Sequence, residues 1–573
     1  MNIPRQEYPR PQLRRTDETY TNLNGTWELE FDPAVSGHES DMRNLRPYSG
    51  QITVPYVIES KLSGVEHIDF MPSLWYRRYF KAPRFDPERD RLLLHFGAVD
   101  YRCEAWLNDV KIGSHFGGYT PFAFDITETV KDADNELVVW VRSNVRDPMQ
   151  PSGKQSERYY NFGCMYTRCT GIWQTVWIER VPRSYIKNLK MTPDVDRECL
   201  DVEVRMAGDD FCGSLSAEAA YKGEYVSGVT VRANAPVVRF SIPIKNPRLW
   251  NPGAPEIYDM TISVGNDRVE TYFGMRKVAV KGRFIEINDK PVFMRLVLDQ
   301  GYYPDGIYTA PNEEALKHDI ELSMKAGFNG ARLHMKIFEP RFIYYADIMG
   351  YILWGEYPNW GIDNSKPEAL ASVVPEWMEE MERDYNSPAI IGWCPLNETC
   401  HMRNEQLHTI PYEITKAIDP MRPVIDTSGY FHTDKYDVFD VHDYCQDVEE
   451  FAGHYAPLAT GEGEVYQNPG QAVRWDGRRP YFVSEYGGIK WEAQSADGAW
   501  GYGSAPENEE EFYNRLEGLT DVLLNTPGIC GFCYTQLTDV YQETNGIYNF
   551  DRTEKLDMER IHGIFSKKAA VEK

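Results

Sequence analysis

Two glutamates follow short apolar segments in the C-terminal half of the chain. Glu398 comes directly after Asn397 and the apolar run 390–396, and Glu485 ends the run 480–484. Both runs have the length and composition of buried strands. If these strands are parallel members of one α/β barrel, both carboxyl groups reach the same mouth of the barrel. Two facing carboxyl groups are what the cleavage of a glycosidic bond requires.

The elements that must position the two glutamates begin near residue 282. From there apolar strands alternate with amphipathic helices, and helices are expected at 312–325 and 339–349. Eight strands are expected, at 291–296, 328–333, 351–354, 390–396, 423–426, 438–441, 481–483 and 529–534. Eight strands within about 290 residues are typical of a (β/α)8 barrel. We therefore predict that residues 281–573 form such a barrel.

The N-terminal half has the pattern of an all-β structure. Residues 91–96 and 136–141 are short apolar or alternating runs, and turn-forming pairs such as Asn24-Gly25 separate such runs. Several short strands at this spacing predict a β-sandwich over residues 1–182. Period-two alternation continues at 200–204 and 238–242. About 100 residues suit one immunoglobulin-like sandwich, which we place at 183–280.

Composition excludes several classes of partner. The formal net charge is −26, and nucleic acid and anionic membranes both reward a basic surface. The sequence contains no apolar stretch of about 18 residues, so no membrane span is expected. The first ten residues lack the apolar segment of a secretory signal, so a cytoplasmic protein is expected. Cys530 and Cys533 have C-x-x-C spacing inside an apolar run, which favours core thiols over a zinc or redox site.

Several motifs together carry a resemblance to a known family. Residues 23–27 read LNGTW, 171–177 read GIWQTVW and 273–276 read FGMR. In the predicted barrel, residues 386–393 lead to Asn397-Glu398, and Glu485-Tyr486-Gly487 follows later. Over essentially the whole chain this order resembles glycoside hydrolase family 2. The resemblance implies a jelly-roll sugar-binding domain, an immunoglobulin-like domain and a catalytic (β/α)8 barrel.

The same resemblance implies roles for five residues. Glu398 corresponds to the general acid and base, and Glu485 to the nucleophile. Asn397 corresponds to the residue that binds the 2-hydroxyl of the sugar. Arg332 matches the arginine that orients the nucleophile, and Tyr444 matches the tyrosine that donates a hydrogen bond to it. A retaining mechanism through a covalent glycosyl-enzyme intermediate follows if the two carboxyl groups lie about 5–5.5 Å apart.

Further candidates lie after the predicted strands, on the face of a barrel where loops build the substrate site. Each of them contacts sugar or supports the scaffold, and the pattern leaves both roles open. They are His334, His442, Asp299, Glu356, Trp360, Trp491 and Asp539. No metal ligands typical of large β-galactosidases have a counterpart, so we expect no metal and no other cofactor.

The segments around the glutamates depart from the family pattern, which leaves the sugar open. His334 lies in Leu333-His334-Met335-Lys336, where Ser-His-Tyr-Pro is usual. β-Glucuronidases of the family carry an Asn-x-Lys motif that meets the sugar carboxylate, and no such motif appears near 545–551. A uronic acid substrate is thus disfavoured, unless Lys336 or another cation takes the place of this motif.

An exo-acting hydrolase of β-galactoside-like substrates is the first prediction, on a small oligosaccharide or glycoside. The same chemistry on a β-glucuronide, β-mannoside, furanoside or arabinoside is an alternative, as is transfer of the glycosyl group to another sugar. A non-catalytic carbohydrate-binding protein is a third hypothesis. Analogy with the family also implies a homo-oligomer, either a dimer or a tetramer.

Overall fold

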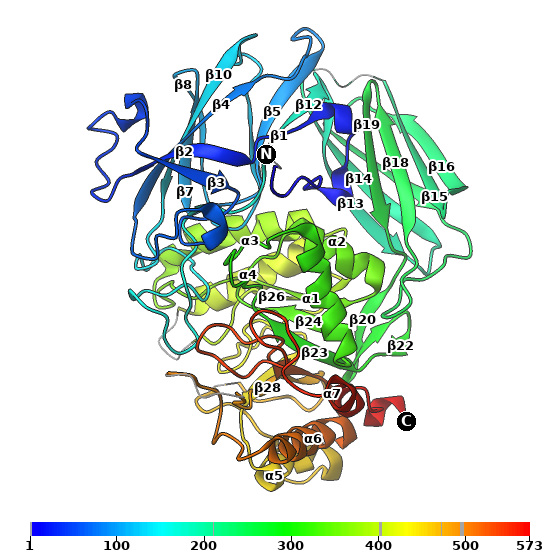
Figure 1. Ribbon diagram of the computed structural model, residues 1–573. Coiled ribbons are helices and arrows are strands. Elements are labelled where there is room, and N and C mark those ends of the chain that lie inside the picture. The colour runs from blue at the N-terminus through cyan, green and yellow to red at the C-terminus, as the bar shows by residue number, and fades with distance from the viewer. Residues whose placement is uncertain (1–2, 210, 212, 400–403, 472, 493–497) are drawn as a thin grey trace.

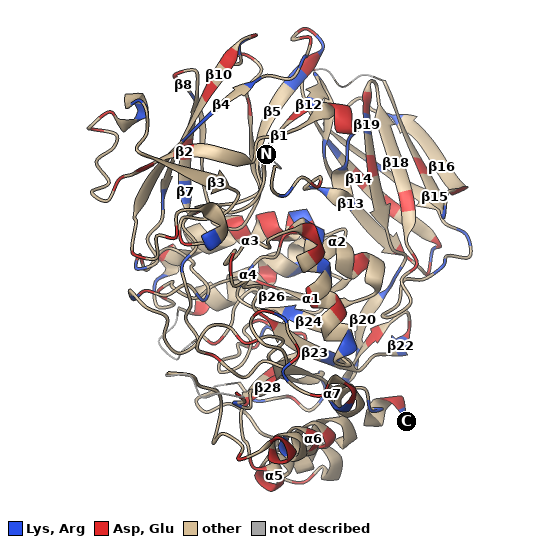
Figure 2. Ribbon diagram, viewed as in Figure 1, with Lys and Arg blue, Asp and Glu red and all other residues tan. Residues whose placement is uncertain are grey.

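The computed structural model of the protein describes residues 3–209, 211, 213–399, 404–471, 473–492 and 498–573. Two β-sandwiches lie side by side above a curled parallel sheet that is covered by helices (Figure 1). Acidic residues are spread over all three parts, with lysine and arginine among them (Figure 2). Among the described residues no helix is both long and apolar enough to cross a membrane.

The first sandwich packs a six-stranded sheet, in the order β3-β2-β4-β10-β7-β8, on a four-stranded sheet, in the order β1-β12-β5-β9; β6 and β11 pair separately. On β10 the alternate residues Leu137, Val139 and Val141 enter the core between the sheets. The strands are β1 (Tyr20–Asn22), β2 (Gly25–Phe31), β3 (Gly50–Val54), β4 (Ser73–Lys81), β5 (Asp90–Phe96), β6 (Val99–Asp100), β7 (Arg102–Leu107), β8 (Val110–Phe116), β9 (Phe122–Asp125), β10 (Asp134–Arg142), β11 (Gly171–Ile172) and β12 (Val176–Pro182).

The second sandwich has seven strands in two antiparallel sheets, β13-β14-β17 and β16-β15-β18-β19. The predicted alternation is present on β14, where Leu200, Val202 and Val204 are buried in the core. Its strands are β13 (Tyr185–Asp194), β14 (Cys199–Ala207), β15 (Ser214–Tyr221), β16 (Glu224–Arg232), β17 (Val237–Pro243), β18 (Tyr258–Val264) and β19 (Asp267–Phe273). The predicted domain boundaries at 182/183 and 280/281 stay predictions.

A small antiparallel sheet of β20 (Val278–Lys281), β21 (Phe284–Ile287) and β22 (Lys290–Pro291) leads into a seven-stranded parallel sheet, in the order β26-β25-β24-β23-β29-β28-β27. Its strands are β23 (Met294–Asp299), β24 (Gly330–Leu333), β25 (Ile352–Glu356), β26 (Ile390–Cys394), β27 (Phe439–Asp443), β28 (Tyr481–Gly487) and β29 (Ile529–Thr535). Apolar side chains such as Leu296, Trp354 and Phe482 fill its interior. The predicted barrel fold is confirmed.

A helix follows each of these seven strands. They are α1 (Glu313–Lys325), α2 (Pro340–Met349), α3 (Leu370–Asp384), α4 (Glu405–Ile418), α5 (Val448–Thr460), α6 (Glu509–Asn525) and α7 (Met558–Phe565). Asn312 caps α1 by accepting a hydrogen bond from the amide of Ala315, and Gly350 ends α2 with φ 71°. Both helix limits agree with the prediction from sequence.

The prediction of a strand at 423–426 is wrong. In place of a strand, this segment forms isolated parallel bridges, Val424 with Trp393 of β26 and Ser428 with Asn397 just after β26. Pro423 has no amide hydrogen to give to a sheet, and this weakens regular pairing here. The segment nevertheless occupies the position of an eighth strand beside β26, because Ile425 donates to the carbonyl of Trp393 at 3.0 Å.

One continuous core joins the first sandwich to the barrel. It contains Tyr119, Tyr166 and Trp173 from the first sandwich together with residues of the barrel helices. The hydroxyl of Thr309, after β23, donates to the carbonyl of Trp173 at 2.6 Å. Such a shared core fixes the first sandwich against the barrel, and with it the loop between β10 and β11, which lies over the barrel mouth.

Candidate active site

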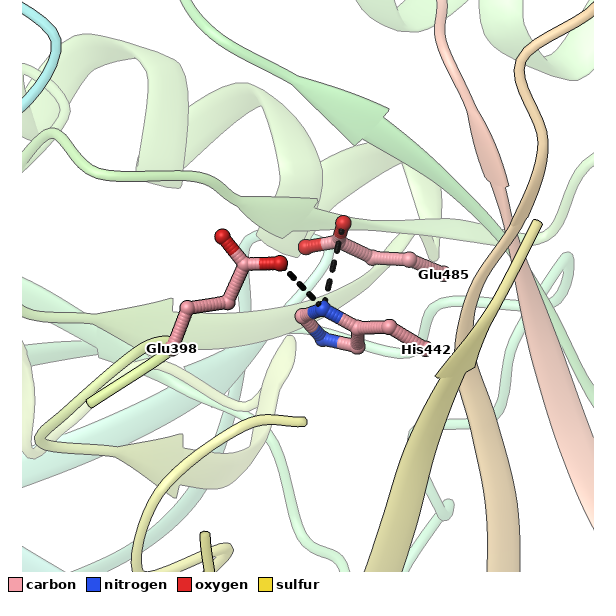
Figure 3. Close-up of side chains that lie close together, drawn as sticks. All are labelled: Glu398, His442 and Glu485. Atoms are coloured by element: carbon pink, nitrogen blue, oxygen red, sulfur yellow. Dashed lines mark hydrogen bonds and ion pairs between the residues drawn. The ribbon is translucent and has the colours of Figure 1, made fainter. Parts of the chain in front are cut away.

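Glu398 and Glu485 face each other at the mouth of the barrel, with His442 between them (Figure 3). Glu398 follows β26, His442 lies on β27 and Glu485 on β28. His442 Nδ1 is 2.8 Å from Glu398 Oε1 and 3.4 Å from Glu485 Oε2. One oxygen of each carboxylate and this nitrogen all lie within 4.8 Å of one another. The parallel strands thus bring together two glutamates that are far apart in sequence.

Glu485 is buried and surrounded by hydrogen-bond donors. Arg332 Nη1 donates to its Oε1 at 3.0 Å, and the hydroxyl of Tyr444 donates to its Oε2. Burial alone would raise the pKa of Glu485, but the positive charges of His442 and Arg332 outweigh burial and hold this pKa well below its usual range. Glu485 is therefore a carboxylate at neutral pH, as a nucleophile must be.

Arg332 is fully buried and connects several parts of the site. Besides Glu485 it binds Glu356 Oε2 through Nη2 at 2.6 Å and donates to Asn397 Oδ1 at 3.1 Å. Glu356 Oε1 is 2.9 Å from His334 Nδ1. Burial lowers the pKa of His334, so this imidazole is neutral at neutral pH. Glu356 thus acts as a counter-ion to Arg332 and lies beside the neutral ring of His334 beneath the mouth.

The backbone at Glu398 is strained. Its φ is 46°, in the left-handed region that non-glycine residues seldom adopt, and its amide donates to the carbonyl of Ser428 at 2.8 Å. Such strain concentrates at functional sites. The preceding Asn397 is held through its carbonyl by Trp360 Nε1 at 3.2 Å, while its buried Nδ2 has no partner among the described residues. That amide is free to donate to a sugar hydroxyl.

Tyr444 is fixed by an aromatic neighbour that sequence reasoning missed. Its ring stacks on Tyr502 with centroids 3.4 Å apart and an angle of 2° between the planes. Burial and the charge of Glu485 raise the pKa of Tyr444 far above its usual value, so its hydroxyl stays protonated and donates to Glu485. Tyr502 lies in the long loop between β28 and α6, where no periodic pattern in the sequence identifies it.

Three predicted candidates do not contact the glutamate pair. Asp299 accepts from the amide of Gly301 at 2.8 Å, and Trp491 packs on Phe512 of α6. Asp539 pairs with Lys555 at 2.7 Å. Their contacts tie each of them to the scaffold around the barrel, so a role in sugar binding stays a prediction for all three.

Two lysines near the mouth differ in what they contact. Lys336, considered above as a partner for a sugar carboxylate, donates to the carbonyls of Gly301 and Tyr308 at 2.6 and 2.8 Å and is occupied. Lys154 is 6% exposed and lies 4.0 Å from the centre of the Trp360 ring. Among the described residues it forms no ion pair. It was missed because it lies on the loop between β10 and β11, in a different domain.

Lys154 stays charged in this position. Burial alone would lower the pKa of its ammonium group, but the surrounding acidic groups, led by Cys164 and Glu543, raise it above the usual value. The loop between β10 and β11 therefore brings a lysine that is positively charged at neutral pH to the mouth of the barrel.

Glu398, His442 and Glu485 are also the group of described residues whose geometry would suit a metal ion. His442 Nδ1 and Glu398 Oε1 are, however, already joined at hydrogen-bond distance. Cys530 and Cys533, the C-x-x-C pair of the sequence, lie apart from this group as buried free thiols on β29. The donor set fits a shared proton as well as a cation, and the expectation that no metal is needed stays a prediction.

Three family models match successive parts of the chain. They are a glycosyl hydrolase 2 galactose-binding domain-like model at residues 49–175, the glycosyl hydrolases family 2 model at 184–276, and the family 2 TIM barrel domain model at 278–498. Their order agrees with the two sandwiches and the barrel. The chain belongs to glycoside hydrolase family 2.

The names of the relatives point to different substrates. A β-galactosidase of Leuconostoc mesenteroides is 26% identical over 74% of this chain and 41% of its own length, so the chain spans about two fifths of that relative. A β-glucuronidase of Paenibacillus borealis is 23% identical over 90% of both chains. The β-glucuronidase structure of Ruminococcus gnavus superimposes with a TM-score of 0.79 at 19% identity, over 99% of this chain and 100% of that one. At this identity the superposition supports the fold.

Proposed function

We propose that the protein is a retaining, exo-acting glycoside hydrolase. The observation that carries this proposal is the close approach of Glu398 and Glu485, whose nearest oxygens lie within 4.8 Å. Retaining enzymes hold their carboxyl groups about 5–5.5 Å apart, whereas inverting enzymes need about 6.5–9.5 Å to admit a water molecule. The spacing therefore favours direct attack by a carboxylate on the sugar.

Each glutamate has a defined task in the two steps. In the first, an oxygen of Glu485 forms a bond to the anomeric carbon while the bond to the leaving oxygen breaks, and Glu398 gives that oxygen its proton. In the second, Glu398 takes a proton from water as the water oxygen attacks the anomeric carbon and releases Glu485. The buried Nδ2 of Asn397, which has no hydrogen-bond partner among the described residues, supports a role for this amide as a donor to the sugar.

The first-domain loop supports the exo-acting part of the proposal. The amide of Ser152 donates to the carbonyl of Trp360, after β25, at 2.7 Å. Further along the same loop, the carbonyl of Gly163 accepts from Gln542 Nε2, after β29, at 2.6 Å. The loop thus bridges two sides of the mouth, where it would obstruct a polysaccharide lying across the barrel and favour a terminal sugar.

Retention is tested by following the anomeric proton of the first product by NMR during hydrolysis of a nitrophenyl glycoside. The β-anomer must appear first from a β-glycoside, and the α-anomer would contradict the proposal. A 2-fluoro glycoside should in addition label Glu485 covalently, which peptide mass spectrometry detects. Labelling of another residue would contradict its role as nucleophile. Transglycosylation uses the same intermediate and would appear as a second glycoside product.

Two sugars remain candidates, and Lys154 bears on the choice between them. A β-galactoside is the first prediction, and a neutral sugar needs no cation. The ammonium of Lys154, which forms no ion pair among the described residues, favours a β-glucuronide as the second, because it offers a charge to a carboxylate. A role as a carbohydrate-binding protein without catalysis is not favoured, since both glutamates are in place. Oligomeric state and cytoplasmic location stay predictions.

The choice is tested with nitrophenyl β-galactoside and β-glucuronide on the wild type and on Lys154→Met, which keeps the length of the side chain and removes its charge. If a carboxylate binds Lys154, the wild type prefers the glucuronide and the variant loses about 10–10²-fold in kcat/KM on it, the value of a charge-assisted hydrogen bond. Preference for the galactoside in the wild type, with equal losses on both substrates in the variant, would leave the neutral sugar as the substrate.

A further inference from the structure

A chain of buried polar side chains leads from His442 away from the mouth. His442 Nε2 is 2.9 Å from the hydroxyl of Ser428, which donates to Asp440 Oδ2 at 2.8 Å. Asp440 Oδ1 is 3.2 Å from His432 Nε2, and His432 Nδ1 is 2.6 Å from Asp426 Oδ1. All five residues are buried. They connect the space between the catalytic glutamates to a pair of carboxylates behind it.

The charges in this chain fix the direction of the two hydrogen bonds of the Ser428 hydroxyl. Burial alone would lower the pKa of His432, but Asp426 and Asp440 raise it to about 10, so His432 is an imidazolium at neutral pH. Burial would raise the pKa of Asp440, but His432 and His442 lower it, so Asp440 is a carboxylate and can only accept. The single hydroxyl hydrogen of Ser428 therefore points to Asp440, and its oxygen accepts from His442. Nε2 of His442 must carry a hydrogen.

The consequence appears at the other nitrogen of the same ring. With Nε2 protonated, His442 Nδ1 and Glu398 Oε1, 2.8 Å apart, have one proton between them. We propose that His442, held in this form by Ser428 and Asp440, is a positioning residue that shares the proton of the catalytic acid Glu398. The proposal rests on the proposed hydrolase function.

The shared proton is used and restored within each turnover. It leaves through Glu398 to the departing oxygen in the first step, and Glu398 recovers one from the attacking water in the second. The Nε2 hydrogen of His442 stays on the ring throughout, because the Ser428 oxygen accepts a hydrogen bond from it and takes up no proton.

Close packing keeps the imidazole of His442 in place. Gly429, with φ 75°, lies against the ring so closely that a β-carbon there would be 2.7 Å from Nδ1. The amide of Gly429 also donates to Asp440 Oδ2 at 3.1 Å. Asn468 binds both the amide and the carbonyl of His442, at 2.9 and 2.6 Å. The ring therefore keeps its nitrogens aligned with Glu398 and Ser428.

Other charged groups also face His442. Glu398 and Glu485 favour its protonation and Arg332 opposes it, while burial opposes it most strongly; the net direction is a raised pKa. Tyr430 lies edge-on with its ring centroid 6.2 Å away. None of these groups contacts Ser428 through its side chain. Removing the Ser428 hydroxyl therefore changes the hydrogen bond at Nε2 and leaves the charges around Nδ1 in place.

The test compares Ser428→Ala with the wild type on two aryl glycosides of the sugar that the wild type cleaves. Phenyl leaves poorly and needs the acid, whereas 2,4-dinitrophenyl leaves without it. We expect kcat/KM for the phenyl glycoside to fall about 10²-fold, with little change for the dinitrophenyl glycoside. Loss of the Nε2 acceptor makes the shared proton easier to lose, so the alkaline limb of the phenyl pH profile should move to lower pH.

Two further variants keep the test decisive. Ser428→Thr retains the hydroxyl and should restore the phenyl activity and the pH profile. Asp440→Asn, which removes the charge that orders the chain, should move the alkaline limb in the same direction as Ser428→Ala. Ser387→Ala is a matched control, because it removes a hydroxyl that donates to another buried carboxyl group, that of Asp347 on α2.

The control should affect both substrates equally. Equal losses on both substrates for Ser428→Ala, with an unmoved pH profile, would overturn the shared proton and leave the hydrolase function standing. A wild type that is inactive on every glycoside would overturn the proposed function, and the shared proton with it.

Discussion

The two glutamates that we propose as the catalytic pair are held in opposite ways. The side chain of Glu485 is 5% exposed and is held by Arg332, Tyr444 and His442, whereas the side chain of Glu398 is 19% exposed and, among the residues that the structure describes, pairs with His442. One carboxylate is fixed in a single charge state by a permanent cation. The other lies beside a side chain that can itself gain and lose a proton. A nucleophile must stay ionised, and an acid must change its charge twice in each turnover.

The largest expected effect separates these two roles. Glu485→Gln removes the nucleophile and should lower kcat by about 10⁴-fold or more on every substrate. Glu398→Ala should be almost as damaging on a phenyl glycoside but should retain much of its rate on a dinitrophenyl glycoside, because that leaving group needs no proton. Added azide should accelerate the alanine variant and yield a glycosyl azide, measured by NMR. Equal responses of both variants would contradict the division of roles.

The second prediction concerns the permanent cation. Arg332→Met leaves Glu485 and Glu356 buried without their counter-ion. Breaking a buried ion pair on one side costs about 3–5 kcal/mol, so we expect a large fall in the urea midpoint along with lost activity. Arg383→Met, which disrupts the pair with Asp384 behind the barrel, is a matched control with a comparable loss of stability. If activity per folded molecule survives in the Arg332 variant, the orienting role is wrong.

A smaller effect is expected from the phenol that donates to the nucleophile. Tyr444→Phe removes one donor from Glu485 and should lower kcat/KM about 10²-fold, the usual value of a single well-placed donor. Tyr351→Phe, which removes a buried hydroxyl bonded to Ser323 away from the mouth, is the control and should keep its activity. A wild-type rate in Tyr444→Phe would show that Arg332 and His442 are enough to hold Glu485.

The last prediction concerns stability and the histidine His432, which lies behind Glu398 and His442. The pKa of His432 is raised to about 10 in the fold, above the value of about 6.5 in an unfolded chain. Its contribution to stability is therefore complete below pH 6.5 and is lost as pH rises towards 10. The difference in Tm between the wild type and His432→Gln should be largest near pH 6.5 and shrink at alkaline pH. A constant difference would exclude a charged His432.

The sequence allowed prediction of those residues whose position follows from a strand alone. Glu398, Glu485, Arg332 and Tyr444 meet because parallel strands end at one mouth, and a strand end can be recognised locally. Asp299, by contrast, also ends a strand, yet its carboxylate turns to the amide of Gly301. A strand end fixes where a side chain starts, and only the packing of the loops decides where it points.

Contacts between domains were beyond the reach of local patterns. Lys154 belongs to the first sandwich, about 200 residues before Trp360, and nothing in its neighbourhood marks a site in the barrel. The fifth strand was predicted from the apolar run at 423–426, but Pro423 and the approach of Ser428 to Asp440 favour an irregular path. This segment does not pair regularly with β26, and its irregular path brings the Ser428 hydroxyl into contact with His442.

The loop between β10 and β11 also limits how this protein can change over time. It rests on Gly153, where a β-carbon would lie 2.4 Å from the carbonyl of Met335, and it carries Lys154 over Trp360. An exchange of the first sandwich alone would therefore remove both contacts from the barrel, so the sandwich contributes to the candidate site as well as to the fold.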